Sequence, residues 1–302
     1  MKKISVITVV YNGQNVIERT INSVVSQTYR ENIEYIIIDG ASKDNTLNIV
    51  KKYEQDIDII VSEPDSGIYD AMNKGIDLAS GEWISFMNAD DIFADNHVLE
   101  RVMSIVDGSE DVICGRTDYI SESDEFMYKD SLRPVDTIFD RMPFCPQSSL
   151  VRSELLKGLK LDTNFRIIAD YDFFMKIYLS GAKFRYVDLT VAVFRWGGLS
   201  TTSVFTAAIE TIYAILKNTS SETAKKSSIY KNLRFLGIDE SELVLLDQAN
   251  KKFISKTQEL ENLNNRINML NSEIERFYSA KVFKFVRVIT SPFSKVAKIF
   301  GK

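Results

Sequence analysis

Apolar runs and helical patterns alternate along the first part of the chain. Residues 4–10 and 34–39 are apolar at nearly every position, which is typical of parallel strands covered on both faces. Between them, apolar residues recur at helical spacing from Val16 to Val25. The same pattern predicts a helix over 69–79 and strands over 58–62 and 82–87. Strand and helix in alternation predict an α/β fold with a Rossmann-like, mostly parallel central sheet flanked by helices.

The rest of the chain is less regular and then becomes helical. We expect short strands up to about residue 200, a helix over 170–180, and helices beyond Thr202. A short heptad seam within 253–280 favours packing on the same protein and leaves a homo-oligomer open. We therefore predict a main domain over 1–202, a helical extension over 203–280 and a basic amphipathic tail over 281–302.

Charge is distributed unevenly. The net charge is −5, and the residues after Glu275 carry +7, which leaves −12 on the residues before them. An acidic body argues against nucleic acid as a partner. In the tail, Val282, Phe285 and Ile289 share one helical face, so we expect peripheral contact with an anionic membrane, with packing on the body as the alternative. These features predict a cytoplasmic protein at the inner face of the cell membrane.

Composition narrows the chemistry. The 302 residues are 45% apolar and 26% charged, which indicates a folded protein. Two cysteines and one histidine, His97, argue against a disulfide framework, a His-rich metal centre and a Ser-His-Asp relay. Acid–base and metal chemistry therefore falls to carboxylates, which prefer Mg²⁺ or Mn²⁺.

One pair of carboxylates stands out. Ligands in parallel α/β sheets bind beyond the carboxyl ends of the strands, and Asn88-Ala89-Asp90-Asp91 follows the predicted strand over 82–87. Two adjacent carboxylates there can hold a divalent cation against a diphosphate. A solvated turn or a helix cap is the plain alternative.

Five ordered segments within residues 1–200 resemble family 2 glycosyltransferases of the GT-A fold, of the bacterial surface-polysaccharide type. They begin at Ile4, Ser26, Ile36, Gly81 and Ile168 and read ISVITVVYNG, SQTY, IIIDGASKDNT, GEWISFMNADD and IADYDFFMKI. The order and spacing match the family. Two departures stand out, because the family often has a second acid where Gly40 stands and an acid where Asn88 stands.

The resemblance implies roles for individual residues. Val9 and Tyr11 would line the nucleotide base, and Asp39 would accept a hydrogen bond from uracil. Asp90 and Asp91 would bind Mn²⁺ or Mg²⁺, and Asp170 would be the catalytic base. The remaining donor-binding residues implied are Asn73, Lys74 and Asn88, with Asp90 shared between donor and metal.

Together these residues suggest a mechanism. A cation at Asp90 and Asp91 would stabilise charge on the departing diphosphate, while a carboxylate takes the acceptor proton. Asp170 sits where a helix N-terminus favours its ionised form, although an ordinary cap is the alternative reading and Asp172 is an alternative base. Attack opposite the leaving group would invert the anomeric centre.

We therefore expect an inverting, metal-dependent glycosyltransferase that uses a UDP-sugar and a growing, lipid-linked surface glycan. A non-catalytic nucleotide-sugar binder or membrane scaffold is the alternative. A dehydrogenase is disfavoured because Gly13 stands alone after the first strand. On the acceptor side, Gln147 and Trp196 are further candidates, with a buried core position the favoured reading of Trp196.

Overall fold

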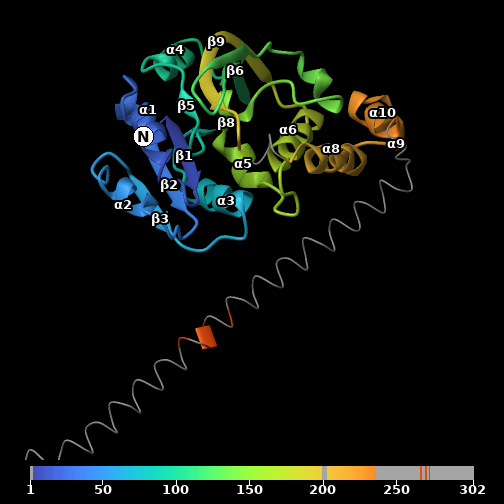
Figure 1. Cartoon of the computed structure of the whole chain (residues 1–302). Helices are drawn as coiled ribbons and strands as arrows, with labels where there is room; N and C mark the ends of the chain where they lie inside the picture. Colours follow the sequence, from blue (N-terminus) through green and yellow to red (C-terminus); the bar gives the residue numbers. More distant parts are fainter. Residues whose placement is uncertain (1–2, 199–202, 236–265, 267–268, 271, 273–302) are drawn as a thin grey trace, which may run out of the picture. The chain divides into compact units, whose positions relative to one another are not determined.

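The computed structural model describes residues 3–198 and 203–235, together with positions 266, 269, 270 and 272 (Figure 1). The described residues up to Phe235 belong to one compact unit, Met1–Asp247. The predicted tail over 281–302 lies outside the described residues, as does the heptad segment apart from the four isolated positions. Among the helices that the structure describes, none has the length and apolarity to span a bilayer.

Four parallel strands form the first half of the sheet. They lie in the order β3-β2-β1-β4, with the bounds β1 (Ile4–Val10), β2 (Ile33–Asp39), β3 (Ile59–Ser62) and β4 (Trp83–Phe86). Every residue of β1 and β2 is buried, as the unbroken apolar runs predict. The parallel register sets Val10 beside Asp39, so β1 and β2 end at the same level, while β4 ends at Phe86 beside Ile7, before the end of β1.

The sheet continues beyond β4 with mixed strand directions. β8 (Ser149–Arg152) pairs antiparallel with β4, and β6 (Val112–Ile120) pairs antiparallel with β8. β9 (Phe184–Arg195) runs parallel to β6 and pairs with the short β5 (Ile92–Phe93), while β7 (Phe126–Lys129) pairs with β6 off this path. The predicted α/β fold with a mostly parallel core is confirmed.

Helices cover both faces of the sheet (Figure 1). One core cluster packs Ile4 and Val6 of β1 against α1 (Ile17–Val25), α2 (Thr46–Lys51) and α4 (Val98–Ser104). The other packs Ile7 and Val9 against α3 (Ile68–Leu78), α5 (Ser153–Leu159) and α6 (Ala169–Leu179). Alternate residues of a strand point to opposite faces, which explains this division. Three 3₁₀ turns complete the part before Gly198: Arg30–Asn32, Val135–Phe139 and Pro146–Ser148.

Beyond residue 202 the described chain is helical. α8 (Val204–Asn218) packs against α6, followed by α9 (Ser221–Lys226) and α10 (Ser228–Phe235). Ile212 and Ile215 of α8 are buried in the same cluster as α6. The described part of the predicted extension therefore shares its hydrophobic core with the helix that carries Asp170.

Candidate functional site

Asp39 ends β2 as a fully buried carboxylate. Its oxygens accept from the backbone N–H of Ser42 at 3.2 Å and from the Ser62 hydroxyl at 2.6 Å. Because a carboxylate has about four acceptor positions, these bonds fix its orientation and leave capacity for a ligand. Tyr11, just after β1, is 58% exposed, whereas Val9 is buried in the core beneath the strand end.

Gly40 and Asp65 meet beside Asp39. A Cβ placed on Gly40 would overlap Asp65 Oδ2 and would lie 3.4 Å from the Tyr11 ring. The loop between β3 and α3 therefore places the Asp65 carboxylate beside position 40. Burial raises the pKa of Asp65 above its usual range, and the nearby charges of Asp39 and Asp70 add to this effect.

The loops after β1 and β2 are joined by hydrogen bonds. Asn12 donates its N–H to Ser42 Oγ at 2.7 Å and accepts from the Lys43 N–H at 2.8 Å. Gln14 Oε1 likewise accepts a hydrogen bond from the Asn45 N–H at 3.0 Å. Asn12 adopts a φ of +51°, which asparagine tolerates better than most residues. These hydrogen bonds fix the loop after β1, which carries Tyr11, against the loop after β2.

The two adjacent carboxylates after β4 occupy different environments. Asp91 is 5% exposed, and burial raises its pKa well above the usual range, with the charge of Asp90 adding to the shift. The Asp90 side chain is 28% exposed, and the backbone there has a φ of +88°, a strained value for a non-glycine residue. Thr20 Oγ1 fixes this turn by accepting from the Asp90 N–H and donating to the Asp91 carbonyl, at 3.0 and 2.9 Å.

Two arginines reach Asp90 from distant parts of the chain. Arg195 at the end of β9 places Nε 3.0 Å from Asp90 Oδ1, and Arg19 of α1 places Nη1 3.6 Å from the same oxygen. Both guanidinium groups also pair with Asp124. No local motif marks Arg19, Arg195 or Asp124, because the partners of these residues lie far away in the chain.

The turn after β4 has oxygen atoms that suit a cation. Asn88 Oδ1 is buried and lacks a hydrogen-bond partner in the described structure, whereas the buried Asp90 Oδ1 is held by ion pairs with Arg195 and Arg19. Oxygen ligands of this kind fit Mg²⁺ or Mn²⁺. Within the described residues, no group of three or more His, Cys, Asp or Glu side chains could hold a metal. The turn therefore suits a cation that takes its other ligands from a bound substrate or from water.

Asp170 lies in the first turn of α6 and lines a small pocket. Its Oδ1 accepts from the Tyr171 N–H at 2.8 Å, and the Tyr69 hydroxyl lies 3.4 Å away. Burial raises its pKa from 3.8 to about 6. The helix N-terminus, expected to favour the ionised form, is thus outweighed by burial.

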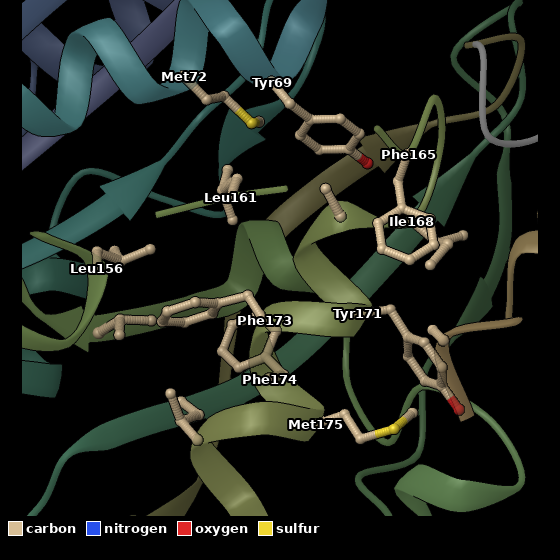
Figure 2. Close-up of a cluster of buried hydrophobic side chains, with 14 of the residues drawn as sticks. Tyr69, Met72, Leu156, Leu161, Phe165, Ile168, Tyr171, Phe173, Phe174 and Met175 are labelled. Carbon is tan, nitrogen blue, oxygen red and sulfur yellow. The ribbon is translucent and has the colours of Figure 1, made fainter. Parts of the chain in front are cut away.

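The pocket beside Asp170 is mostly apolar. Figure 2 shows Tyr69 and Met72 of α3 facing the loop and helix that carry Leu161, Phe173 and Phe174. The polar lining residues besides Asp170 are Gln147 and Ser149, and Phe86, the last residue of β4, also lines the pocket. Since Asn88 follows Phe86 by two residues, β4 connects the Asp170 pocket with the acidic turn.

Several predicted residues make contacts within the protein. Both hydrogen bonds of the Asn73 amide go to the Leu161 backbone, at 2.8 and 2.9 Å. Lys74 pairs with Glu63 at 2.9 Å, at the start of the loop that carries Asp65. Asp172, the alternative base, is fully buried and pairs with Lys176 at 2.6 Å and with Asn218 of α8 at 2.7 Å.

On the acceptor side, one expectation is wrong. Trp196 is 37% exposed rather than buried, since it follows the last residue of β9, Arg195, and lies in a turn. Gln147 is 8% exposed and lines the pocket with Asp170.

Sequence comparison places the chain among glycosyltransferases. A family model described as Glycosyl transferase family 2 matches residues 5–179. A "PGL/p-HBAD biosynthesis glycosyltransferase" of Mycobacterium bovis (strain BCG / Pasteur 1173P2) is 31% identical over 208 residues, covering 66% of this chain and 80% of the relative.

Solved structures share the fold. TarS 1–349 of S. aureus in complex with UDP-GlcNAc has a TM-score of 0.61 and 19% identity, covering 80% of this chain and 77% of that chain. Mannosyltransferase PcManGT from Pyrobaculum calidifontis, in complex with GDP-Man and Mn²⁺, has a TM-score of 0.57 and 18% identity, covering 84% and 73%. These likenesses confirm the predicted GT-A fold.

The raised pKa of Asp170 predicts a stability effect. Between 3.8 and about 6 the folded state holds this proton more tightly than the unfolded state, so rising pH costs the wild type stability. Asp170→Asn does not ionise, so its free energy of unfolding relative to wild type should rise between pH 4 and 6 and then level off. Urea unfolding at several pH values measures this. A difference that is independent of pH would contradict the assigned shift.

Proposed function

The chain belongs to glycosyl transferase family 2, and from that premise we propose that it transfers a sugar from a UDP-sugar to a hydroxyl group of a growing surface glycan, with inversion. The observation that carries the proposal is the course of β4. This strand lines the pocket of Asp170 and then enters the turn that presents Asn88 and Asp90. β4 would thus join the pocket of the proposed base to the turn of the proposed diphosphate site.

The nucleotide would bind at the ends of β1 and β2. The exposed Tyr11 ring offers a face for the base, and buried Asp39 offers an acceptor for a uracil N–H. Asp65 beside Gly40 adds a second carboxylate for donor hydroxyls. The TarS structures with UDP and UDP-GlcNAc support the choice of uridine.

The diphosphate would bind at the acidic turn. Asp90, with Asn88, would hold Mn²⁺ or Mg²⁺, which would supply positive charge to the diphosphate as it leaves. Asp91 is enclosed, so we assign it to shaping the turn. The guanidinium groups of Arg195 and Arg19 pair with Asp90 at this turn, and we propose that they also contact the diphosphate, since guanidinium groups bind phosphate oxygens well.

Asp170 would accept the proton of the attacking hydroxyl. With a pKa of about 6 it is largely ionised at neutral pH and still basic enough to take a proton in the transition state. A base on the face opposite the leaving group yields inversion. Gln147 in the same pocket would orient the acceptor.

We further propose that the acceptor is lipid-linked and that residues 281–302 bring the enzyme to the inner face of the membrane. The support is in the sequence, where seven basic residues follow Glu275 without an acid.

Replacing the base tests the catalytic assignment. Asp170→Asn should lower the rate of transfer by about 10² to 10⁴, the usual contribution of a general base, with UDP affinity unchanged. In the wild type, transfer should fall as pH drops through about 6. Asp172→Asn is the matched control from the same turn of α6 and should retain transfer. The reverse pattern would make Asp172 the base.

Replacing the metal ligand tests the diphosphate site. Asp90→Ala should reduce the enhancement of UDP affinity by Mn²⁺ at least about tenfold, since a ligand is lost. Calorimetric titration with and without Mn²⁺ measures this. Asp95→Ala, an exposed acid paired with Arg101, is the control. Equal enhancement in wild type and Asp90→Ala would place the cation elsewhere.

Removing residues 281–302 tests the membrane proposal. The shortened chain should lose binding to phosphatidylglycerol vesicles in a sedimentation assay, because the basic residues of the tail supply the attraction. UDP affinity should be unchanged. Vesicle binding equal to that of the full chain would show that the tail is not the contact.

A further inference from the structure

Glu210 of α8 is a buried carboxylate at the entry to the helix that carries Asp170. Its side chain is 4% exposed. The two oxygens accept from consecutive backbone N–H groups, Arg166 to Oε1 and Ile167 to Oε2, both at 2.9 Å. A buried charge is costly unless hydrogen bonds compensate it, so these bonds hold the carboxylate and the loop together.

Both backbone polar groups of Ile167, its N–H and its carbonyl, are hydrogen-bonded to side chains. Glu210 accepts its N–H, while the Tyr69 hydroxyl of α3 donates to its carbonyl. The same hydroxyl lies 3.4 Å from Asp170 Oδ1. α6 begins two residues after Ile167. The hydrogen bonds of Glu210 and Tyr69 with the Ile167 backbone therefore set where the first turn of α6 starts and how it is oriented.

We propose that Glu210 is a positioning residue for Asp170, acting through the 166–168 backbone and through its own negative charge. This inference rests on the proposed function, in which Asp170 is the base. Glu210 lies beyond the family match, which ends at residue 179. The geometry of the base would therefore depend on a helix outside the matched region.

The charges around Asp170 agree with this assignment. The ionisable groups that face it are Tyr69 from α3 and Glu210 from α8, and Arg166 lies near Glu210. Burial is the main cause of the raised pKa of Asp170, and the negative charge of Glu210 raises it further. Neutralising Glu210 should therefore lower the pKa of the base.

The experiment compares Glu210→Gln with Lys217→Gln in the full chain. Glutamine keeps the shape of the side chain and one acceptor oxygen but removes the charge. Lys217 lies two turns further along α8 and contacts Asp162 and Phe165 of the preceding loop, but not the 166–168 peptides. It therefore reports any general loosening of this loop. The measurements are kcat and KM for a UDP-sugar across pH 5 to 9.

We expect Glu210→Gln to lower kcat about five- to tenfold, as for one lost hydrogen bond, with the donor KM unchanged. The fall of kcat on the acidic side of the pH profile, the acidic limb, should move to lower pH. Lys217→Gln should leave the limb in place. An unmoved limb with wild-type kcat in Glu210→Gln, or equal effects in both variants, would overturn the inference.

Two further variants keep this outcome separate from the proposed function. Glu210→Ala removes both acceptors and should lower kcat more than Glu210→Gln; should it fail to fold, Glu210→Gln alone decides. If Asp170→Asn retains transfer, the proposed base is wrong, and the positioning role with it. If Asp170→Asn is inactive while Glu210→Gln behaves as wild type, only the positioning role fails.

Discussion

The site depends on the parallel pairing of β2 and β4 on either side of β1. Val10 of β1 lies beside Asp39 of β2, and β4 is paired along the other side of β1. Since parallel neighbours project their following loops from one edge of the sheet, Tyr11, Asp39 and Asn88 all emerge there. Helices on both faces of the sheet (Figure 1) leave every residue of β1 and β2 buried. The hydrophobic core therefore sets the positions of the site residues.

Burial, more than local charge, separates the roles of the carboxylates. Asp90 and Asp91 are adjacent, yet one is partly open and the other enclosed. Asp170 stands at a helix N-terminus, but its pKa is raised because desolvation outweighs the helix dipole. Tertiary packing thus gives similar acids different chemical properties.

The sequence predicts the strands closely and the long-range contacts poorly. The predicted strand over 4–10 coincides with β1, because burial on both faces leaves an unbroken apolar run. Arg195, in contrast, meets Asp90 only through the folding of β9, and Glu210 meets the 166–168 loop only through the packing of α8 on α6. The spacing of residues along the sequence does not indicate such contacts between distant segments. For the same reason, the exposure of Trp196 could not be read from its type.

The close approach of Asp65 to Gly40 has a consequence for substitutions in this loop. A side chain at position 40 would collide with Asp65 Oδ2. An acid placed there would therefore displace the Asp65 carboxylate and would crowd negative charges beside Asp39. The effect of a substitution at position 40 thus depends on which residue stands at position 65.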